Sequence, residues 1–506
     1  MLLGAAFRFH ALGQDARFHP DEALFSTFAR SAAVNGDWLL HGPLDKTPLT
    51  IYAAALSMSL VGVHPLPNGV LDLDIHTGEF AARLPGTLAS ILLVATMYGL
   101  ARALYHGRFV ATVAMLLTAL SPLAIAFSAT VFTDGLMLLF VAIALAMIAR
   151  GRWGWSGVFL ALGFASKQQA LYYAPLLLAV GWAVGRRGMM HHALTTSLSR
   201  IARFALPTLV MLALLLAWDG ARAQPGGIWG LAAANNTPGR LIRSNEILPR
   251  LLKWTGYAQT LAGPSWLTAA LGLVGASGVI GRVVCEPRRH ATLVDVVLAA
   301  YLLIYGLAHW LVAFNTYDRY LLPMLPLVLL LMARGADWGK NLIQRNRETE
   351  RQRKVISFAP LYLCLSVFCL FSLCPTAFEA SEGRIQVGAD LGEHSGIDAL
   401  AAYLNSRVLG AIVYDHWLGW ELGYYLGPWS DKRRVYYPTP DALVAGALLQ
   451  PDPAPRYFPA PADQPITPWL EALREAGFAI TLVYDTPQFV VYELLPPARQ
   501  QDPMAE

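Results

Sequence analysis

The chain has 506 residues, of which 55% are hydrophobic and only 14% are charged. This balance, together with a mean hydropathy of +0.44, excludes an ordinary soluble domain and indicates a polytopic α-helical membrane protein. The formal net charge of +4 gives no support for nucleic-acid binding. The four cysteines show neither a disulfide framework nor metal-ligand spacing, so we interpret them as small apolar residues.

The N-terminal segment 1–13 is apolar but carries Arg8 and His10. It is shorter than the roughly 20 apolar residues that a bilayer requires. We expect either a tilted first span or the end of a longer helix that begins upstream. A cleaved signal peptide is the competing interpretation, but no convincing small-residue cleavage site precedes Asp15.

Residues 15–83 are predicted to form the first outer loop, with juxtamembrane helices. Segment 21–34 has apolar residues at helical spacing, which is typical of an amphipathic helix at the membrane interface. Asp21 and Glu22 stand at its start, where the helix dipole favours negative charge. Segment 47–63 is apolar, but a full span here would place the later basic loops outside. We therefore expect a re-entrant or juxtamembrane element.

Apolar spans are expected near 84–101, 109–131, 133–149, 153–166, 169–185, 204–218, 261–282, 291–313, 320–333 and 355–375. With the N-terminal segment they give about eleven spans. Basic residues that mark the cytoplasmic side are Arg102, Arg108, Arg150, Arg152, Arg186, Arg187, Arg288, Arg289 and the run from Arg345 to Lys354. The loops on the other side, including the long segment 219–260, are then outside.

The C-terminal part changes character, so we divide the chain into a membrane domain (1–375) and an extracytoplasmic α/β domain (376–506). Strands are predicted at 410–414, 434–437, 478–484 and 488–494, and helices at 396–409, 417–426 and 468–476, with a Pro-rich loop at 451–468.

Several ionisable residues converge on the predicted outer face: Asp21, Lys46, the acidic segment 64–80, Asp134, Lys167 and Arg319. Each has an ordinary explanation, as a helix cap, a snorkelling lysine or an interface anchor. Together they suit a reaction at a lipid-linked phosphate. Cations stabilise a departing phosphate, and one carboxylate can deprotonate an acceptor hydroxyl.

Six short motifs carry a resemblance to a known superfamily. They are His19-Pro20-Asp21-Glu22, Lys46-Thr47-Pro48-Leu49, Arg83-Leu84-Pro85-Gly86, Thr133-Asp134-Gly135, Ala165-Ser166-Lys167 and Arg319-Tyr320-Leu321-Leu322-Pro323. In this order they resemble the GT-C glycosyltransferases. Within that superfamily, residues 15–335 are similar to the bacterial protein O-mannosyltransferase and lipid A aminoarabinose transferase group, which uses polyprenyl-phosphate sugars.

The resemblance implies an inverting hexosyl- or pentosyltransferase without a covalent intermediate. Asp21 would be the general base and Glu22 its companion, and Asp134 would shape the site. The implied partners of the donor phosphate are Lys46, Arg83, Lys167 and Arg319. No cofactor is expected to be required, although Asp21, Asp134 and His76 leave a divalent metal open.

The sequence does not identify the acceptor, which is a lipid, a glycan or a protein. Trp417 and Trp420 are candidate acceptor-binding residues because aromatic rings stack on sugars; a structural role for them is equally open. The resemblance places the protein in a bacterial plasma membrane. Two other function classes stay open: a transporter or lipid flippase, although no internal repeat is found, and a non-enzymatic envelope scaffold.

Overall fold

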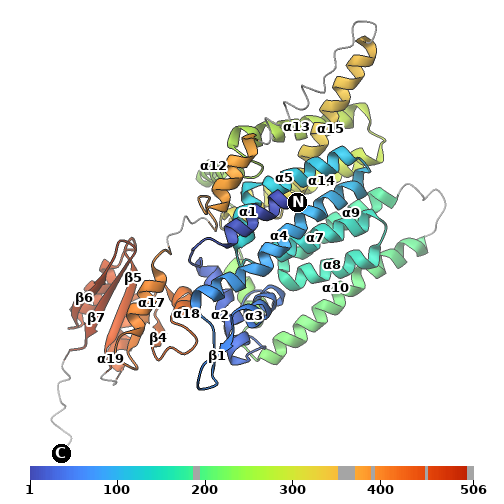
Figure 1. Ribbon diagram of the computed structural model, residues 1–506. Helices are drawn as coiled ribbons and strands as arrows, with labels where there is room; N and C mark the ends of the chain where they lie inside the picture. The colour runs from blue at the N-terminus through green and yellow to red at the C-terminus, as the bar shows by residue number, and fades with distance from the viewer. Residues whose placement is uncertain (186–193, 351–370, 389–393, 451–453, 498–506) are drawn as a thin grey trace, which may run out of the picture. The chain divides into compact units, whose positions relative to one another are not determined.

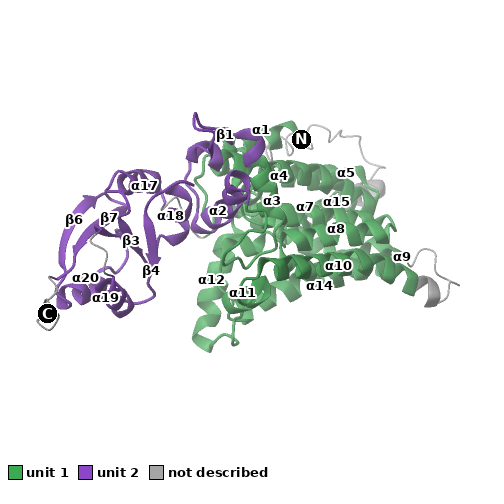
Figure 2. Ribbon diagram, turned by 90° about the horizontal axis from the view of Figure 1, so that it is seen from below, with its two compact units in different colours: residues 1–14, 37–57, 80–391 green, residues 15–36, 58–79, 392–506 purple. Residues whose placement is uncertain are grey.

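The computed structural model describes residues 1–185, 194–350, 371–388, 394–450 and 454–497, and the chain forms two compact units. Figure 1 shows the chain in sequence colours. Unit 1 comprises residues 1–14, 37–57 and 80–391, and unit 2 comprises residues 15–36, 58–79 and 392–506 (green and purple in Figure 2). The predicted boundary at 375/376 divides residues in the membrane from residues outside it. The two units are defined by contacts within the chain and do not test this division, so the boundary stays a prediction.

Unit 1 is built from helices, two of which (α3 and α4) continue into unit 2. Its helices are α1 (Leu2–Leu12), α3 (Leu49–Val61), α4 (Ile75–Tyr105), α5 (Arg108–Leu120), α6 (Pro122–Ala126), η1 (Phe127–Ala129), α7 (Asp134–Ala149), α8 (Trp153–Ser166), η2 (Gln168–Tyr173), α9 (Ala174–Gly185), α10 (Leu194–Arg222), α11 (Gly227–Asn236), η4 (Ser244–Glu246), α12 (Ile247–Ala258), α13 (Ser265–Cys285), α14 (His290–Leu311), η5 (Asp318–Leu321) and α15 (Leu325–Glu350).

Among the described residues, four helices are long and apolar enough to cross a membrane, namely α4, residues Leu198–Arg222 of α10, α13 and α14. The pair formed by α5 and the following Pro122–Ala129 segment would add a fifth span, bent by 56°. The chain is therefore a multi-pass membrane protein, as its composition predicts. The number of about eleven spans stays a prediction, and most of the expected span 355–375 lies outside the described residues.

The expected span 109–131 corresponds to a bent pair of helices, because the helix breaks after Leu120. Pro122 starts α6, and the Ser121 hydroxyl caps that helix by accepting from the Ala124 amide. Arg8 of α1 is fully buried and donates to the carbonyls of Thr118 and Ala119, at 2.9 and 3.0 Å. These carbonyls belong to the last turn of α5, where carbonyl groups have no hydrogen-bond partner within the helix. Arg8 therefore stabilises the break.

The segment 219–260, expected as a long outer loop, contains the helices α11 and α12, and its location outside stays a prediction. Its basic residues have local structural roles. Arg250 donates to the carbonyls of His309, Trp310 and Val312 at the C-terminal end of α14. Arg240 pairs with Glu246 at the surface. These positive charges therefore cap helix ends and join loop segments.

Unit 2 contains a five-stranded mixed sheet in the order β4-β3-β5-β7-β6. Its elements are α2 (Pro20–Asn35), β1 (His64–Pro65), β2 (Leu71–Asp72), α17 (Ile397–Asn405), β3 (Ile412–Asp415), α18 (Gly419–Tyr425), β4 (Arg433–Tyr436), α19 (Pro440–Leu449), β5 (Arg456–Pro461), α20 (Thr467–Glu475), β6 (Ala479–Asp485) and β7 (Phe489–Leu495). The buried core includes Phe458, Trp469 and Leu473. The predicted α/β character of this region agrees with the sheet, while its extracytoplasmic location stays a prediction.

The expected interfacial helix 21–34 is α2, and it packs against α18 of the same unit. Arg30 donates to the carbonyls of Gly423 and Tyr424. The Phe18 amide donates to the Tyr425 hydroxyl at 2.6 Å. The apolar face of α2 is thus buried in protein, and α2 folds together with segments almost 400 residues away.

The Pro-rich loop expected at 451–468 contains strand β5, which the sequence pattern missed together with α19. Pro459 and Pro461 argue against a central strand because proline cannot donate to the sheet ladder. The parallel pairing of β5 with β3 ends at Tyr457, before both prolines. Only the antiparallel pairing with β7 includes them, and it ends at Pro461. The two prolines, which have no amide donor, therefore lie beyond the part of β5 that pairs with a strand on each side.

Candidate active site

A buried ion pair joins the start of α7 to the end of α8. Only three residues connect these two helices, so Asp134, the first residue of α7, and Lys167, just after α8, lie at the same end. The Lys167 ammonium donates to both Asp134 carboxylate oxygens at 2.8 Å. Asp134 is 1% and Lys167 4% exposed. Lys167 is therefore a paired buried cation and does not reach toward water.

The motif Arg83-Leu84-Pro85-Gly86 lies where α4 packs closely against the turn that leads into Asp134. Arg83 is buried on α4. One turn later the Thr87 hydroxyl donates to the Ser128 carbonyl at 3.1 Å. A Cβ added to Gly86 would lie 2.6 Å from the Thr130 carbonyl oxygen. Glycine therefore lets α4 approach the turn that leads into Asp134.

Replacing Gly86 by alanine is expected to push this turn away from α4 and to destabilise the protein by about 1–3 kcal/mol, as overpacked sites do. Thermal unfolding in detergent measures the effect. Gly99→Ala on the same helix is the matched control, because its Cβ would meet only the flexible Arg150 side chain at 3.5 Å. Equal melting temperatures for both variants would contradict this role of Gly86.

Lys46 lies on a segment that is fixed from both sides. The Gln168 side-chain amide, one residue after Lys167, donates to the Asp45 carbonyl at 2.8 Å. Arg222, fully buried at the end of α10, donates to the carbonyls of Leu40 and Gly42. Lys46 itself pairs with the Asp45 carboxylate. The segment that carries Lys46 is thus attached next to Lys167.

Arg319 lies on η5, where its guanidinium faces the rings of Phe132, Tyr317 and Tyr320 at 5.3, 4.8 and 5.8 Å. The Tyr173 hydroxyl donates to the Pro323 carbonyl, which ties η2 to the segment after Arg319. Arg319 and Lys46 both act electrostatically on Lys167. The structure therefore gathers Lys46, Arg319 and Asp134 around Lys167, and their roles at a donor phosphate stay predictions.

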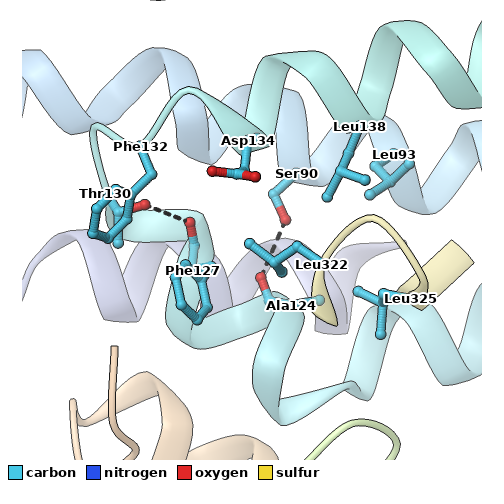
Figure 3. A pocket seen from close by; sticks show the side chains of 11 residues that line it. Ser90, Leu93, Ala124, Phe127, Thr130, Phe132, Asp134, Leu138, Leu322 and Leu325 are labelled. Carbon is cyan, nitrogen blue, oxygen red and sulfur yellow. Dashed lines mark hydrogen bonds between the residues drawn. The ribbon is translucent and has the colours of Figure 1, made fainter. Parts of the chain in front are cut away.

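Two cavities adjoin this cluster. A small one of about 20 Å³, lined by Asp134 and mostly apolar side chains such as Leu138 and Leu322, is shown in Figure 3. This volume holds about one water. The second, of about 400 Å³, lies between α12, α14 and η5 and is almost entirely apolar. Tyr320 lines it, so it begins beside Arg319.

In unit 2 the carboxylates of Asp21 and Glu22 differ in role. His19 is the N-cap of α2; its ring accepts from the Asp21 amide, and Glu22 accepts from the His19 amide at 3.2 Å. This is a reciprocal capping box, which accounts for the buried Glu22. The Asp21 side chain is half-buried. Capping thus explains Glu22 without chemistry, and Asp21 is the better candidate for a base.

A metal at Asp21, Asp134 and His76 stays a prediction, because Asp134 belongs to unit 1 and the other two belong to unit 2. Within unit 2, His76 groups with Asp15 and Glu79, and their ligand atoms lie within 4.8 Å of one another. The Arg17 guanidinium contacts all three of these residues. Both oxygens of Asp134 accept from Lys167. Side-chain cations of the protein thus already bind both sets of carboxylates.

The two candidate acceptor residues lie in unit 2 in different environments. Trp417 packs against Phe458 and Trp469, with ring centroids at 6.1 and 5.5 Å, and so contributes to the core of the unit. Trp420 on α18 is 45% exposed. Of the two, Trp420 has the ring surface that a sugar can reach. Acceptor binding stays a prediction for both.

Sequence reasoning missed Gln168 and Arg222 as positioning residues. Gln168 follows Lys167 directly, and this adjacency was the one available signal. Arg222 has no local signal, because it resembles the other basic residues of its segment until its burial is known.

A family profile described as "Dolichyl-phosphate-mannose-protein mannosyltransferase" matches residues 45–218, which include Lys46, Arg83, Asp134 and Lys167. A comparison with curated protein sequences finds no match.

Solved structures with a similar fold include ArnT from Cupriavidus metallidurans bound to undecaprenyl phosphate. The TM-score is 0.61 and the identity 15%, over 97% of this chain and 96% of that one. The Archaeoglobus fulgidus oligosaccharyltransferase in the apo form has a TM-score of 0.58 and an identity of 11%, over 99% of this chain and 74% of that one. The predicted resemblance to the GT-C glycosyltransferases is confirmed, and the fold is shared.

Proposed function

We propose that the protein is a GT-C glycosyltransferase that moves a sugar from a polyprenyl-phosphate carrier to an acceptor hydroxyl. The observation that carries this proposal is the gathering of Lys46, Lys167 and Arg319 at one end of the helical bundle. A leaving phosphate needs positive charge, and preorganised cations stabilise the charge that develops in the transition state.

The apolar cavity beside Arg319 supports a lipid-linked donor. Its lining of leucine, tryptophan and tyrosine side chains suits an isoprenoid chain, with the phosphate directed toward Arg319. Two structures with the same fold hold such lipids: the ArnT structure is bound to undecaprenyl phosphate. The oligosaccharyltransferase AglB from Archaeoglobus fulgidus, with a TM-score of 0.52, is in complex with an inhibitory peptide and a dolichol-phosphate.

In the proposed reaction, Asp21 takes the proton of the acceptor hydroxyl as that oxygen attacks the anomeric carbon. The bond from this carbon to the phosphate oxygen breaks, the configuration inverts, and the polyprenyl phosphate leaves as an anion. Asp134 holds the Lys167 ammonium in place for this anion. These cations supply charge that a metal would otherwise supply, so we propose that no metal is required. We propose that the site lies on the outer face of a bacterial plasma membrane; the positive-inside pattern supports the outer face, and the family resemblance supports the bacterial membrane.

Replacing Arg319 by glutamine tests the donor site by lipid binding alone. Losing a charged hydrogen-bond donor costs about 1.5–3 kcal/mol, so the dissociation constant of undecaprenyl phosphate is expected to rise roughly 10- to 100-fold. Binding to the purified protein in neutral detergent measures this change. Undecaprenol, which lacks the phosphate, is expected to bind both forms equally.

The matched control is Arg240→Gln, which removes one positive charge from an exposed surface pair. Exposed pairs contribute little, so this variant should bind undecaprenyl phosphate like the wild type. If Arg319→Gln binds undecaprenyl phosphate as tightly as the wild type does, Arg319 is not a phosphate partner.

A further inference from the structure

A second cationic cavity lies in unit 1, at the other end of α7 and α8 from Asp134. It has a volume of about 600 Å³ and is lined by Gly151, Arg152, Trp153, Gly154, Trp155, Val158, Arg200, Arg203 and Pro207. This volume falls within the range of roughly 300–1,000 Å³ typical of small-molecule sites. Because α8 runs from Trp153 to Ser166, the helix separates this cavity from Lys167 by its whole length.

Two of the arginines that line this cavity, Arg152 and Arg203, have no counter-charge among the described residues. Three arginines line it, and no acidic residue is among the described residues that do so. Within the described part of the chain, the guanidinium groups of Arg152 and Arg203 form no hydrogen bond or ion pair with another residue. Both side chains are exposed. The cavity therefore offers two guanidinium groups with their donors available, which is the geometry that binds phosphate oxygens.

The backbone adds to this charge. Helix α8 begins at the cavity, with Arg152 as its N-cap, and no side chain caps its first turn. Unpaired amides at a helix N-terminus favour an anion. On the other wall, α10 packs closely on α8, since a Cβ at Gly157 would lie 2.1 Å from the Phe204 carbonyl oxygen. This close contact holds the arginines of α10 beside the start of α8.

The apolar surroundings point to a lipid. Trp155 is 59% exposed and lies directly beside the arginines, and tryptophan is typical of the headgroup level of a membrane. On the membrane-facing stretch of α10 beyond Arg203, Leu206, Leu209 and Val210 are 62%, 59% and 51% exposed. The cavity thus combines cations at the membrane boundary with an apolar surface that continues into the bilayer.

We infer that this cavity binds the headgroup of an anionic phospholipid, with its phosphate between Arg152 and Arg203 and its acyl chains along α10. The lipid belongs to the leaflet opposite the candidate active site, because Arg152 and Lys167 mark opposite ends of α8. This site is separate from the donor site and takes no part in the proposed transfer.

Native mass spectrometry of the full-length protein in neutral detergent tests this inference. The protein is incubated with equal amounts of phosphatidylglycerol and phosphatidylcholine that have identical acyl chains. The wild type is expected to retain one phosphatidylglycerol in preference to phosphatidylcholine. Each arginine near a membrane surface contributes about a fivefold preference for an anionic lipid. Arg152→Gln and Arg203→Gln should therefore each lose roughly fivefold, and the double variant about 25-fold.

Arg108→Gln is the matched control. Arg108 is an exposed arginine at the same end of the bundle, three residues after the end of α4, and it does not line the cavity. Arg150 marks this end, because it donates to the Gly99 carbonyl of α4. The control should keep the wild-type lipid preference.

Equal retention of both lipids by the wild type, or an unchanged preference in the double variant, would overturn the inference. Excess inorganic phosphate distinguishes a lipid site from a site for a soluble phosphate compound. A lipid site keeps its phosphatidylglycerol, whereas displacement of the lipid would assign the arginines to a soluble ligand and contradict the inference.

Discussion

Lys167→Met is expected to lower the free energy of unfolding by roughly 3–5 kcal/mol and to abolish sugar transfer. The substitution removes the ammonium that donates to both oxygens of Asp134, and it leaves a carboxylate that is only 1% exposed without this partner. Breaking a buried ion pair from one side has a cost of this size. Unfolding in detergent and transfer assays measure the two effects separately.

The double variant Asp134→Leu/Lys167→Met separates folding from function. Replacing both charges with apolar groups is often neutral for stability, so the double variant should recover most of the stability that the single variant loses. It should still fail to transfer sugar, because a cation for the leaving phosphate is missing. A double variant that is stable and active would show that the pair is structural only.

Asp21→Asn is expected to lower the transfer rate about 10²- to 10⁴-fold, which is the usual contribution of a general base. Asparagine keeps the size of the side chain and the backbone amide that donates to His19, so α2 should fold normally. Undecaprenyl phosphate binding should not change, because the proposed phosphate partners are other residues. A loss of donor binding in parallel with the rate would contradict the role of a base.

Glu22→Gln is the natural comparison for Asp21→Asn. Glutamine can replace glutamate in a capping box, so this variant should keep α2 and most of the transfer rate. If Glu22→Gln were as inactive as Asp21→Asn, the two carboxylates would share the chemistry, and the capping role would not suffice for Glu22.

Local patterns predicted the parts of the fold that depend on neighbouring residues. The hydrophobic segments at 133–149 and 153–166 correspond to α7 and α8, and the alternation near 488–494 corresponds to β7. The distribution of basic residues also predicted that Asp134 and Lys167 face the same side of the membrane. That both oxygens of Asp134 bond to Lys167 could not be predicted, because it depends on the side-chain packing of two helices.

Long-range contacts explain the main errors. The break after Leu120 is stabilised by Arg8, more than 100 residues away. The packing of α2 on α18 joins residues 30 and 424. Strand β5 tolerates its prolines because one neighbouring strand stops pairing before them. None of these causes appears in a local window of sequence, since each one depends on which distant segment lies alongside.

The most direct test of the account is the transfer of radiolabelled sugar from a panel of synthetic polyprenyl-phosphate sugars. Purified wild-type protein and Asp21→Asn are incubated in membranes with total envelope acceptors, with and without a metal chelator. The account predicts that at least one donor transfers label to lipid, glycan or protein, that the chelator has no effect, and that the variant is nearly inactive. A folded wild-type protein that transfers label from no donor would contradict a glycosyltransferase.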